Sequence, residues 1–493
     1  MPGLTSSLNI GLSGLQAAQS ALSVVGHNIS NVNTPGYSRQ RAILSSNDSQ
    51  TFGALQFGTG VGLDNIFGVR DRFLEMQIVQ ATGRQKGSET RFAGLEGISP
   101  VFEETGESGL GTLIQRFFQS FDELASRPED GAVRRNVVGR AQSLVDGLKS
   151  RWNLLQEQRS QADRNVGSLV QEVNNLTSQI AALNDRIATE PSPGADSDAR
   201  DQRKALADRL AELVGVQVFE DSKSRLQVTL DSGAAVLVSG STAYTLSATP
   251  DATLGNFFRV DVSLGAGAPI NVTGAIRDGA LGANLDLRDN LLATYQRRLD
   301  ELAAGVAGQV NLQHRSGYAL DGVTTGLDFF LGAAANGANG LPTTVSAASN
   351  YRGMVNSLTV NASVVSDPRL IAASGAAGAA GNNQNARALS ALQLAAGTVD
   401  TNGDGLGDSG PFSTAVGALA NTIGTQAQGF QTRSTNDQNL LTALSNQRER
   451  VSGVDLDEEA TALLTFQRGY QASAQFISVI NQLTDQLVNQ FGR

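Results

Sequence analysis

The sequence predicts a mainly α-helical, elongated, multi-domain protein with an inserted β domain. Three patterns lead to this expectation. Both ends read as amphipathic helices with almost no charge, a heptad repeat runs from Val166 to Ile187, and the hydrophobic period changes to two beyond Val214. We expect the terminal helices to pair like a coiled coil as an inner domain, with a long helical bundle next and the β-rich domain outermost.

The first 38 residues contain no Asp, Glu, Lys or Arg. Apolar residues recur there at steps of three and four, which is the pattern of one helical face: Leu4, Leu8, Leu12, Leu15, Ala18, Leu22, Val25 and Ile29. This pattern predicts a helix over 4–32, although Gly11, Gly14 and Gly26 each cost about 1 kcal/mol relative to alanine. Pro35 and Gly36 end the helix, and residues 42–70 read as short strands and loops.

A second helical region begins near Asp71. It has breaks at 97–100 and 106–109, and it ends in Phe117, Phe118 and Phe121, which we assign to the core. After an interruption at 127–131, the heptad repeat and the apolar residues upstream predict one helix of about 50 residues, near 75 Å long. Residues 190–198 form a polar connection, and a return helix carries Leu206, Leu210 and Leu213.

Alternating apolar residues then predict a small β domain over 215–278. Helical periodicity returns from Leu285 to Val310 and ends near His314, and we expect a last bundle helix over 412–450. Ser452 and Gly453 turn the chain into the terminal helix, which Asp455 caps with Glu458 three residues later.

These elements predict four units. The terminal helical assembly domain is 1–70 with 452–493, including an extended N-terminal loop. The rod-like bundle is 71–214, 279–330 and 366–451, the β domain is 215–278, and an irregular or β region packed on the bundle or the outer domain is 331–365.

The composition excludes several classes of function. The net charge of −10 argues against a nucleic-acid or anionic-membrane binder, and the chain has no cysteine. No run of eighteen apolar residues and no typical cleaved signal peptide occurs. The few aromatic residues favour helix packing through small side chains and a scaffold over a catalyst.

Candidate chemistry is sparse. His27 and His314 are the two histidines, and both read as packing or capping residues; Asp457, Glu458 and Glu459 fit the first turn of a helix. No HExxH, GxSxG or P-loop motif occurs. We therefore assign no catalytic residue, no cofactor and no metal ligand.

One stretch resembles a calcium-binding loop. Asp400, Asn402, Asp404, Gly405 and Asp408 match positions 1, 3, 5, 6 and 9 of such a loop, but the twelfth position is Pro411 in place of a bidentate Glu. A surface turn is the favoured interpretation.

The two ends resemble the flagellar axial family of rod, hook and hook-associated proteins. The resemblance rests on residues 11–17, the run His27-Asn-Ile-Ser-Asn-Val-Asn-Thr-Pro-Gly-Tyr-Ser-Arg-Gln40, and residues 452–460 and 466–475. Residues 117–184, 282–289, 311–314, 317–322, 328–330 and 381–386 are similar to the hook–filament junction members.

This resemblance implies a structural adaptor, not an enzyme: a ring of subunits at the hook–filament junction. It implies unfolded export by the flagellar type III apparatus without a cleaved signal peptide, an export chaperone, and contacts with the hook protein and a second hook-associated junction protein. A hook or distal rod protein is the alternative, and a secreted calcium-binding adhesin or hydrolase is a third. Neither nucleic-acid binding nor membrane insertion is expected.

We expect the subunit interface at the terminal helices and the N-terminal loop. The residues are Leu4, Leu8, Leu12, Leu15, Leu22, Val25, Ile29, Asn31, Pro35, Gly36, Tyr37, Phe466, Tyr470, Phe476, Ile477, Ile480, Leu483 and Leu487.

Overall fold

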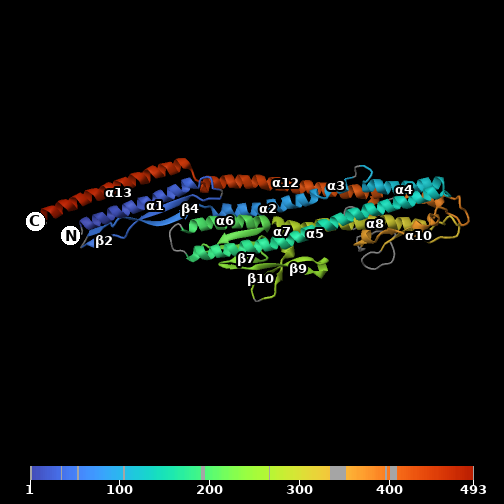
Figure 1. Ribbon diagram of the computed structural model, residues 1–493, viewed down its shortest axis with the longest axis horizontal. Helices are drawn as coiled ribbons and strands as arrows, with labels where there is room; N and C mark the ends of the chain where they lie inside the picture. Colours follow the sequence, from blue (N-terminus) through green and yellow to red (C-terminus); the bar gives the residue numbers. More distant parts are fainter. Residues whose placement is uncertain are drawn as a thin grey trace.

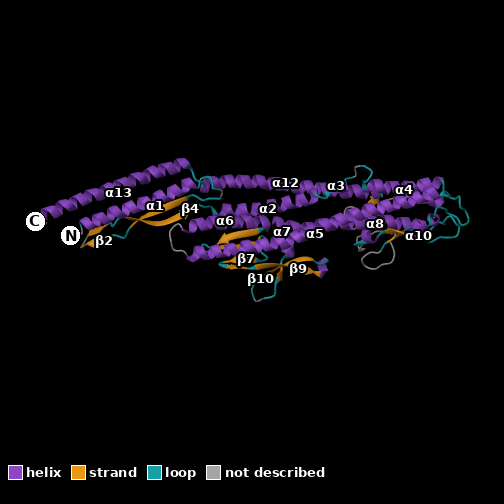
Figure 2. Ribbon diagram, in the orientation of Figure 1, coloured by secondary structure: helices purple, strands orange, loops and turns teal. Residues whose placement is uncertain are grey.

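The computed structural model describes residues 3–34, 36–52, 55–103, 106–189, 195–265, 267–332, 351–394, 397–399 and 408–491. The molecule is elongated, with both chain ends at the same end of the long axis (Figure 1). Helices form its length and the small sheets lie along one side (Figure 2). The expected fold class is confirmed: a mainly α protein with paired terminal helices and an inserted β domain.

The terminal helices pack side by side at one end of the molecule. α1 is Leu4–Ser30 and α13 is Leu456–Phe491. Between α1 and the bundle the chain forms a long antiparallel arm, in which β1 (Gln40–Ser46) pairs with β4 (Val61–Gly68), and β2 (Gln50–Phe52) pairs with β3 (Leu55–Phe57). β1 and β4 both pack on α1. Gly36 has φ +85°, so the turn after α1 uses the conformational freedom that only glycine has.

The bundle contains α2 (Arg72–Glu96), α3 (Ser99–Phe102), α4 (Leu110–Ser126), α5 (Gly131–Thr189), α6 (Ala195–Leu213) and α12 (Phe412–Ser452), together with the helices that follow the β domain and are described below. α12 packs along α2 and α4. α5 has 59 residues, about 90 Å, and is longer than expected. It begins directly after the interruption because Val133, Val137 and Ala141 continue the buried stripe toward its N-terminus.

The β domain contains two antiparallel sheets. One has the order β5-β6-β7-β8 and the other β11-β10-β9. The strands are Val216–Glu220, Leu226–Leu230, Val236–Ser239, Thr242–Ala243, Thr245–Asp251, Phe257–Ser263 and Ile270–Asn271 for β5 to β11, with short 3-10 turns at Ala252–Leu254 and Thr273–Ala275. The heptad stripe of α5 packs on α6, on a further short helix described below (Gly279–Asp286) and on these sheets, so its partners are two short helices and a β layer and not a second long helix.

The helix predicted from Leu285 is not regular. α7 (Gly279–Asp286) and α8 (Leu292–Arg315) are joined by a π-helical segment, Leu287–Leu291. Within this segment Arg288 is fully buried, and it bonds to Asp163 of α5 at 2.6 Å and to the Phe258 carbonyl of β10 at 2.8 Å. The extra residue of the π turn thus directs the Arg288 guanidinium into the contact between the bundle and the β domain.

The far end of the bundle has an aromatic core, contrary to the expectation of small-residue packing. Its rings lie 5.0–6.1 Å apart and belong to Phe117, Phe118, Phe121, Phe329, Phe330 and Phe412. A few aromatic residues suffice because they are concentrated there. Short elements close this end: β12 (Phe330–Leu331), α9 (Met354–Ser357), β13 (Thr359–Val360), α10 (Ala362–Ser366), a 3-10 turn (Pro368–Leu370), α11 (Gln384–Ala391), β14 (Gly397–Val399) and β15 (Asp408–Gly410).

Candidate assembly interface

The contact between α1 and α13 is made through small residues. A Cβ added at Gly11 would lie 2.8 Å from Ile477 Cγ1 and 3.0 Å from Phe476 Cδ1, and one added at Gly14 would lie 2.9 Å from Ser473 Oγ. Such distances are too short for carbon atoms, so these two glycines allow the helices to approach closely. They cost helix propensity, but they create the seam in which the two terminal helices meet.

The predicted interface residues differ in solvent exposure. Val25 and Ile480 are buried; Leu4, Leu8, Leu15, Leu22, Ile29, Asn31, Gly36, Tyr37, Phe466 and Ile477 are partly buried; and Leu12, Tyr470, Phe476, Leu483 and Leu487 are exposed. Pro35 lies outside the described residues. The apolar face of the last helix is therefore wide: one edge packs on α1, the other edge is exposed, and Phe476 lies between them, with its ring edge near Gly11.

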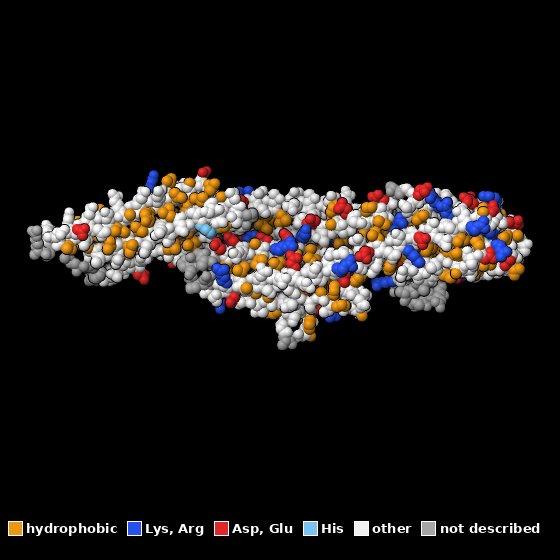
Figure 3. Space-filling view, in the orientation of Figure 1, with side chains coloured by type: hydrophobic (Ala, Val, Ile, Leu, Met, Phe, Trp, Pro, Cys, Tyr) orange, Lys and Arg blue, Asp and Glu red, His pale blue; other side chains and the backbone are white. Residues whose placement is uncertain are grey.

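The exposed face of α13 is a stripe of four apolar residues, which we call the outer stripe: Phe476, Val479, Leu483 and Leu487, each 41–48% exposed. The spacing of three and four residues places them on one side of the helix, about a quarter turn from the seam. Figure 3 shows hydrophobic side chains gathered over the terminal helices, whereas charged side chains lie mostly along the bundle. An apolar stripe of this kind marks an interaction surface.

A buried polar cluster ties the seam to the rest of the molecule. Asn28 is 1% exposed, and its amide donates to the Gln40 carbonyl at 2.9 Å and to Glu459 Oε2 at 3.1 Å. Its Oδ1 accepts from the Gln40 N–H at 2.9 Å and from the Tyr37 hydroxyl at 2.8 Å. One side chain thus joins α1, the chain after it and the start of α13. Burial, with nearby carboxylates, raises the pKa of Tyr37, so its hydroxyl remains a donor.

The segment Gly36–Gln40 also bonds to the bundle. Arg39 pairs with Glu459 at 2.6 Å and with Glu458, and its N–H donates to the Ser452 carbonyl at 2.9 Å. Ser38 Oγ donates to Asp201 of α6 at 3.0 Å, and Arg448 of α12 donates to the Gly36 carbonyl at 2.7 Å. These bonds connect the terminal helices to α6 and α12, which belong to the bundle.

Sequence reasoning did not find this cluster. Asp455 does cap α13, since its Oδ1 accepts from the Asp457 N–H at 2.8 Å and the Glu458 N–H at 3.4 Å. The carboxylate of Glu458, however, pairs with Arg39, so the expected return half of the capping box is not made. The signal in the sequence is the acidic run 457–459. The helix dipole accounts for exposed carboxylates there, but Glu459 is only 2% exposed and pairs with Arg39.

The two histidines have different surroundings. His314 is fully buried: its Nδ1 lies 2.7 Å from the Leu327 carbonyl, and its Nε2 accepts from the Ala372 N–H at 3.0 Å. Burial lowers its pKa to about 4, so at neutral pH it is an uncharged packing residue. His27 Nδ1 lies 3.0 Å from the Tyr37 hydroxyl, at the edge of the polar cluster.

Nothing in the described ranges points to a metal. Among those residues, no three His, Asp or Glu side chains converge as ligands would. The calcium-like stretch 400–408 lies outside the described residues except for the backbone of Asp408 in β15, so no ligand geometry can be assigned to it. A search of the described helices for one long and apolar enough to cross a membrane finds none.

The chain matches three family models along its length. Residues 8–37 match the flagella basal body rod protein, residues 95–330 the helical domain of flagellar hook-associated protein FlgK, and residues 446–490 the C-terminal region of the flagellar basal body rod FlgEFG proteins. The ends are thus of a type found in rod proteins, while the bundle and β domain match hook-associated protein. This combination favours the junction members over the hook and rod alternative.

Similar proteins extend the match to the whole chain. Flagellar hook-associated protein 1 of Salmonella typhimurium is 30% identical over 99% of this chain and 100% of its own length, and that of Escherichia coli is 28% identical over the same shares. The protein of Bacillus subtilis is 26% identical over 97% and 96%.

The fold is also that of a solved relative. The structure of the flagellar hook junction protein FlgK from Burkholderia pseudomallei superposes with a TM-score of 0.64, at 17% identity, over 76% of this chain and all of the other. With 30% identity over the full length of the Salmonella protein and the helical-domain match, the chain belongs to the flagellar hook-associated protein 1 family and is a structural component of the bacterial flagellum.

Proposed function

We propose that this chain is the non-catalytic adaptor between hook and filament, and that its copies join in a ring through their terminal helices. The observation that carries the proposal is the outer stripe of α13. It is exposed and uncharged, and it lies on a helix whose other face already packs on α1. A helix that packs one part of its apolar surface within its own chain and exposes the rest is suited to bind a neighbouring subunit.

The stripe favours a closed or helical assembly over a two-fold dimer. It lies on one side of the α1–α13 pair. A separate groove beside that pair has both apolar and charged lining, from Val24, Val25, Ile43, Phe67 and Phe466 and from Arg39, Arg41 and Glu459. A stripe that meets a different surface on the next copy makes a head-to-tail contact, and such contacts generate rings when the rotation closes.

The ring contacts the hook protein on one side and a second hook-associated junction protein on the other. The flagellar type III apparatus exports the chain unfolded and without a cleaved signal peptide to the extracellular flagellum, and an export chaperone covers the outer stripe before assembly. An exposed apolar stripe of this size on a free chain promotes self-association unless something covers it.

The test uses charge on the outer stripe. Leu483→Glu with Leu487→Glu adds two charges to the stripe without touching the seam, so the double variant is expected to fold and to be exported. Burying either charge at a subunit contact would cost several kcal/mol, on the order of 3 or more. We expect cells with this variant to release filament protein into the medium and to lose motility.

The matched control is Ser478→Glu with Gln482→Glu, two exposed positions of α13 on another side of the helix. This control is expected to retain filaments. Equal motility of both double variants, with normal levels of exported protein, would show that the outer stripe is not a subunit contact. Antibodies against this chain should label only the outer end of the hook. Label along the whole hook would contradict the assignment of the chain to the hook–filament junction.

A further inference from the structure

The terminal domain, which comprises α1, α13 and strands β1 to β4, is attached to the bundle without a shared apolar core. The bundle and the β domain contain three clusters of buried apolar residues, and among the described residues none of the three clusters includes a residue of the terminal domain. The chain crosses between the two units at 69–71 and 453–455, and neither crossing is helix or strand. The orientation of the terminal domain therefore depends on polar contacts.

One set of these polar contacts lies at the C-terminal end of α12. Arg448 Nη2 donates to the Gly36 carbonyl at 2.7 Å, and the Arg39 N–H donates to the Ser452 carbonyl at 2.9 Å. These contacts lie beside the crossing at 453–455. A tilt of the terminal domain about this crossing would change them least, because they are close to the axis of the movement.

A second set of polar contacts lies on α6 and depends on two carboxylates. Asp201 accepts from the Ser38 hydroxyl at 3.0 Å and from the Ser38 N–H at 3.3 Å, and it pairs with Arg70 at 2.7 Å. Asp198, about one helical turn earlier, accepts from Gln40 Nε2 at 3.2 Å. Ser38 and Gln40 are buried, so these donors are shielded from water.

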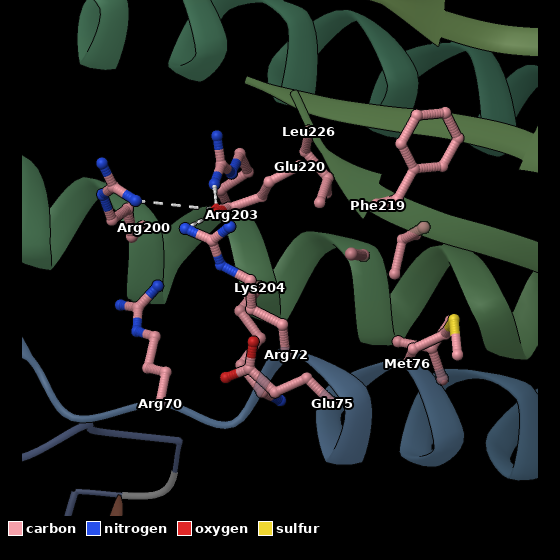
Figure 4. Close-up of a pocket in the computed structure, with 13 residues that line it drawn as sticks. Arg70, Arg72, Glu75, Met76, Arg200, Arg203, Lys204, Phe219, Glu220 and Leu226 are labelled. Carbon is pink, nitrogen blue, oxygen red and sulfur yellow. Dashed lines mark hydrogen bonds and ion pairs between the residues drawn. The ribbon is translucent and has the colours of Figure 1, made fainter. Parts of the chain in front are cut away.

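α6 is fixed on the bundle by its apolar side. Ala207, Leu210 and Leu213 are buried in the cluster that α6 shares with α5 and the β domain. Arg70 extends from the segment before α2 toward α6 (Figure 4), and its Nη2 also donates to the Ser197 carbonyl at 3.2 Å. The carboxylates of α6 therefore hold the terminal domain against a fixed support, on a helix other than α12.

The space between the two sets of contacts is polar. Burial raises the pKa of Glu75 in α2; the nearby charges of Arg70, Lys204 and Arg448 oppose this rise, and that of Asp208 adds to it. Four buried atoms of this group, two donors and two acceptors, have no hydrogen-bond partner among the described residues: Arg70 Nε, Arg448 Nε, Glu75 Oε1 and Asp208 Oδ1. Equal numbers of donors and acceptors suit water, which acts as both, so hydrogen bonds in this space can exchange partners when the two units tilt.

We propose that Asp198 and Asp201 form a latch that holds the terminal domain at one angle to the bundle, and that the domain tilts about the end of α12 when the latch opens. The latch consists of hydrogen bonds and one ion pair, so it opens without separating an apolar core. The contacts on α12 keep the open form attached. This device belongs to a single chain and depends neither on the outer stripe nor on assembly into a ring, so its test is separate from that of the proposed function.

The test measures distances between pairs of spin labels on the purified full-length chain. The chain has no cysteine, so labels attach only to introduced ones. Ser178 of α5 and Ser478 of α13 are exposed, and the distance between labels at Ser178→Cys and Ser478→Cys reports the angle between the two units. Ser478 lies about 33 Å along α13 from Leu456, so a tilt of about 10° moves it by about 6 Å.

Asp198→Ala with Asp201→Ala removes the latch. We expect a narrow distance distribution in the chain with an intact latch, and a distribution shifted or widened by about 6 Å or more in the double variant. The matched control is Asp146→Ala with Glu157→Ala, which removes two exposed carboxylates of α5 and changes the net charge equally. This control should leave the distribution unchanged.

A second pair of labels shows whether the terminal domain stays folded. Ser23 of α1 is exposed, and labels at Ser23→Cys and Ser478→Cys should keep one distance in every variant, because α1 and α13 move together. Equal distributions between positions 178 and 478 in the latch variant and the control would overturn the proposal. So would a broad distribution in the chain with an intact latch, or a change in the distance between positions 23 and 478 in the latch variant, since the terminal helices would then have separated and not tilted.

Discussion

Gly11→Ala, compared with Gly26→Ala, separates the two effects of glycine in α1. Both changes add the same methyl group to the same helix, and both gain about 1 kcal/mol of helix propensity. At Gly26 an added Cβ meets nothing within 4 Å, whereas at Gly11 it would lie 2.8 Å from Ile477 Cγ1. Overpacking of this kind costs about 1 to 3 kcal/mol. We expect Gly26→Ala to stabilise α1, and Gly11→Ala to lose about 1 to 3 kcal/mol relative to it.

The assay is hydrogen exchange of α1 amides, read on peptides that span residues 4–30, because the one tryptophan, Trp152, lies in α5 and does not report on the seam. A difference of about 1 to 3 kcal/mol between the two variants corresponds to a factor of about 5 to 150 in the equilibrium constant for opening of α1. Ile477→Ala removes the nearer of the two atoms that a Cβ at position 11 would meet, so Gly11→Ala should cost less in that background. Equal protection of α1 in Gly11→Ala and Gly26→Ala would refute the close-contact account of the seam.

Two further predictions concern buried polar groups. Asn28→Ala removes the hydrogen bonds that the Asn28 amide makes with the Gln40 backbone and with the Tyr37 hydroxyl, so it should lower protection of α1 by about 2 to 4 kcal/mol. Asn9 is exposed, and Asn9→Ala is the control. Equal hydrogen exchange in the two variants would show that the polar cluster around Asn28 does not stabilise α1. His314 has a folded pKa of about 4, below its ordinary value of 6.5. Its contribution to stability is therefore present above pH 6.5 and is lost as pH falls from there toward 4. His314→Gln should remove that part of the pH dependence, as measured by urea midpoints at pH 7 and pH 4.5, and an unchanged dependence would show that other groups cause it.

The sequence predicted what depends on periodicity. The charge-free helix from Leu4, the heptad stripe through Val166 and the strands around Val228 each follow a local repeat, and each is present. The repeats do not indicate which element packs against each apolar face. The heptad stripe predicts an apolar neighbour equally well whether that neighbour is a helix or, as here, two short helices and a β layer.

The polar cluster could not be predicted for a different reason. Asn28 and Glu459 are 431 residues apart, and neither stands out in its own helix. Only the fold brings Asn28, Gln40 and Glu459 together. In the same way, the glycine at position 11 reads as a helix breaker until Ile477 is placed against it, and the π turn at Arg288 has no marker in the local pattern.

The separation between Asn28 and Glu459 also determines the order of events during folding. α1 and α13 lie at opposite ends of the chain, so the seam cannot close before the segments between them have been drawn together. The β domain and the contacts of α5 with α4 and α6, which are closer in sequence, can form earlier. Loop-closure entropy thus delays the pairing of the two ends, and the surface that joins one copy to the next is the last part of the molecule to mature.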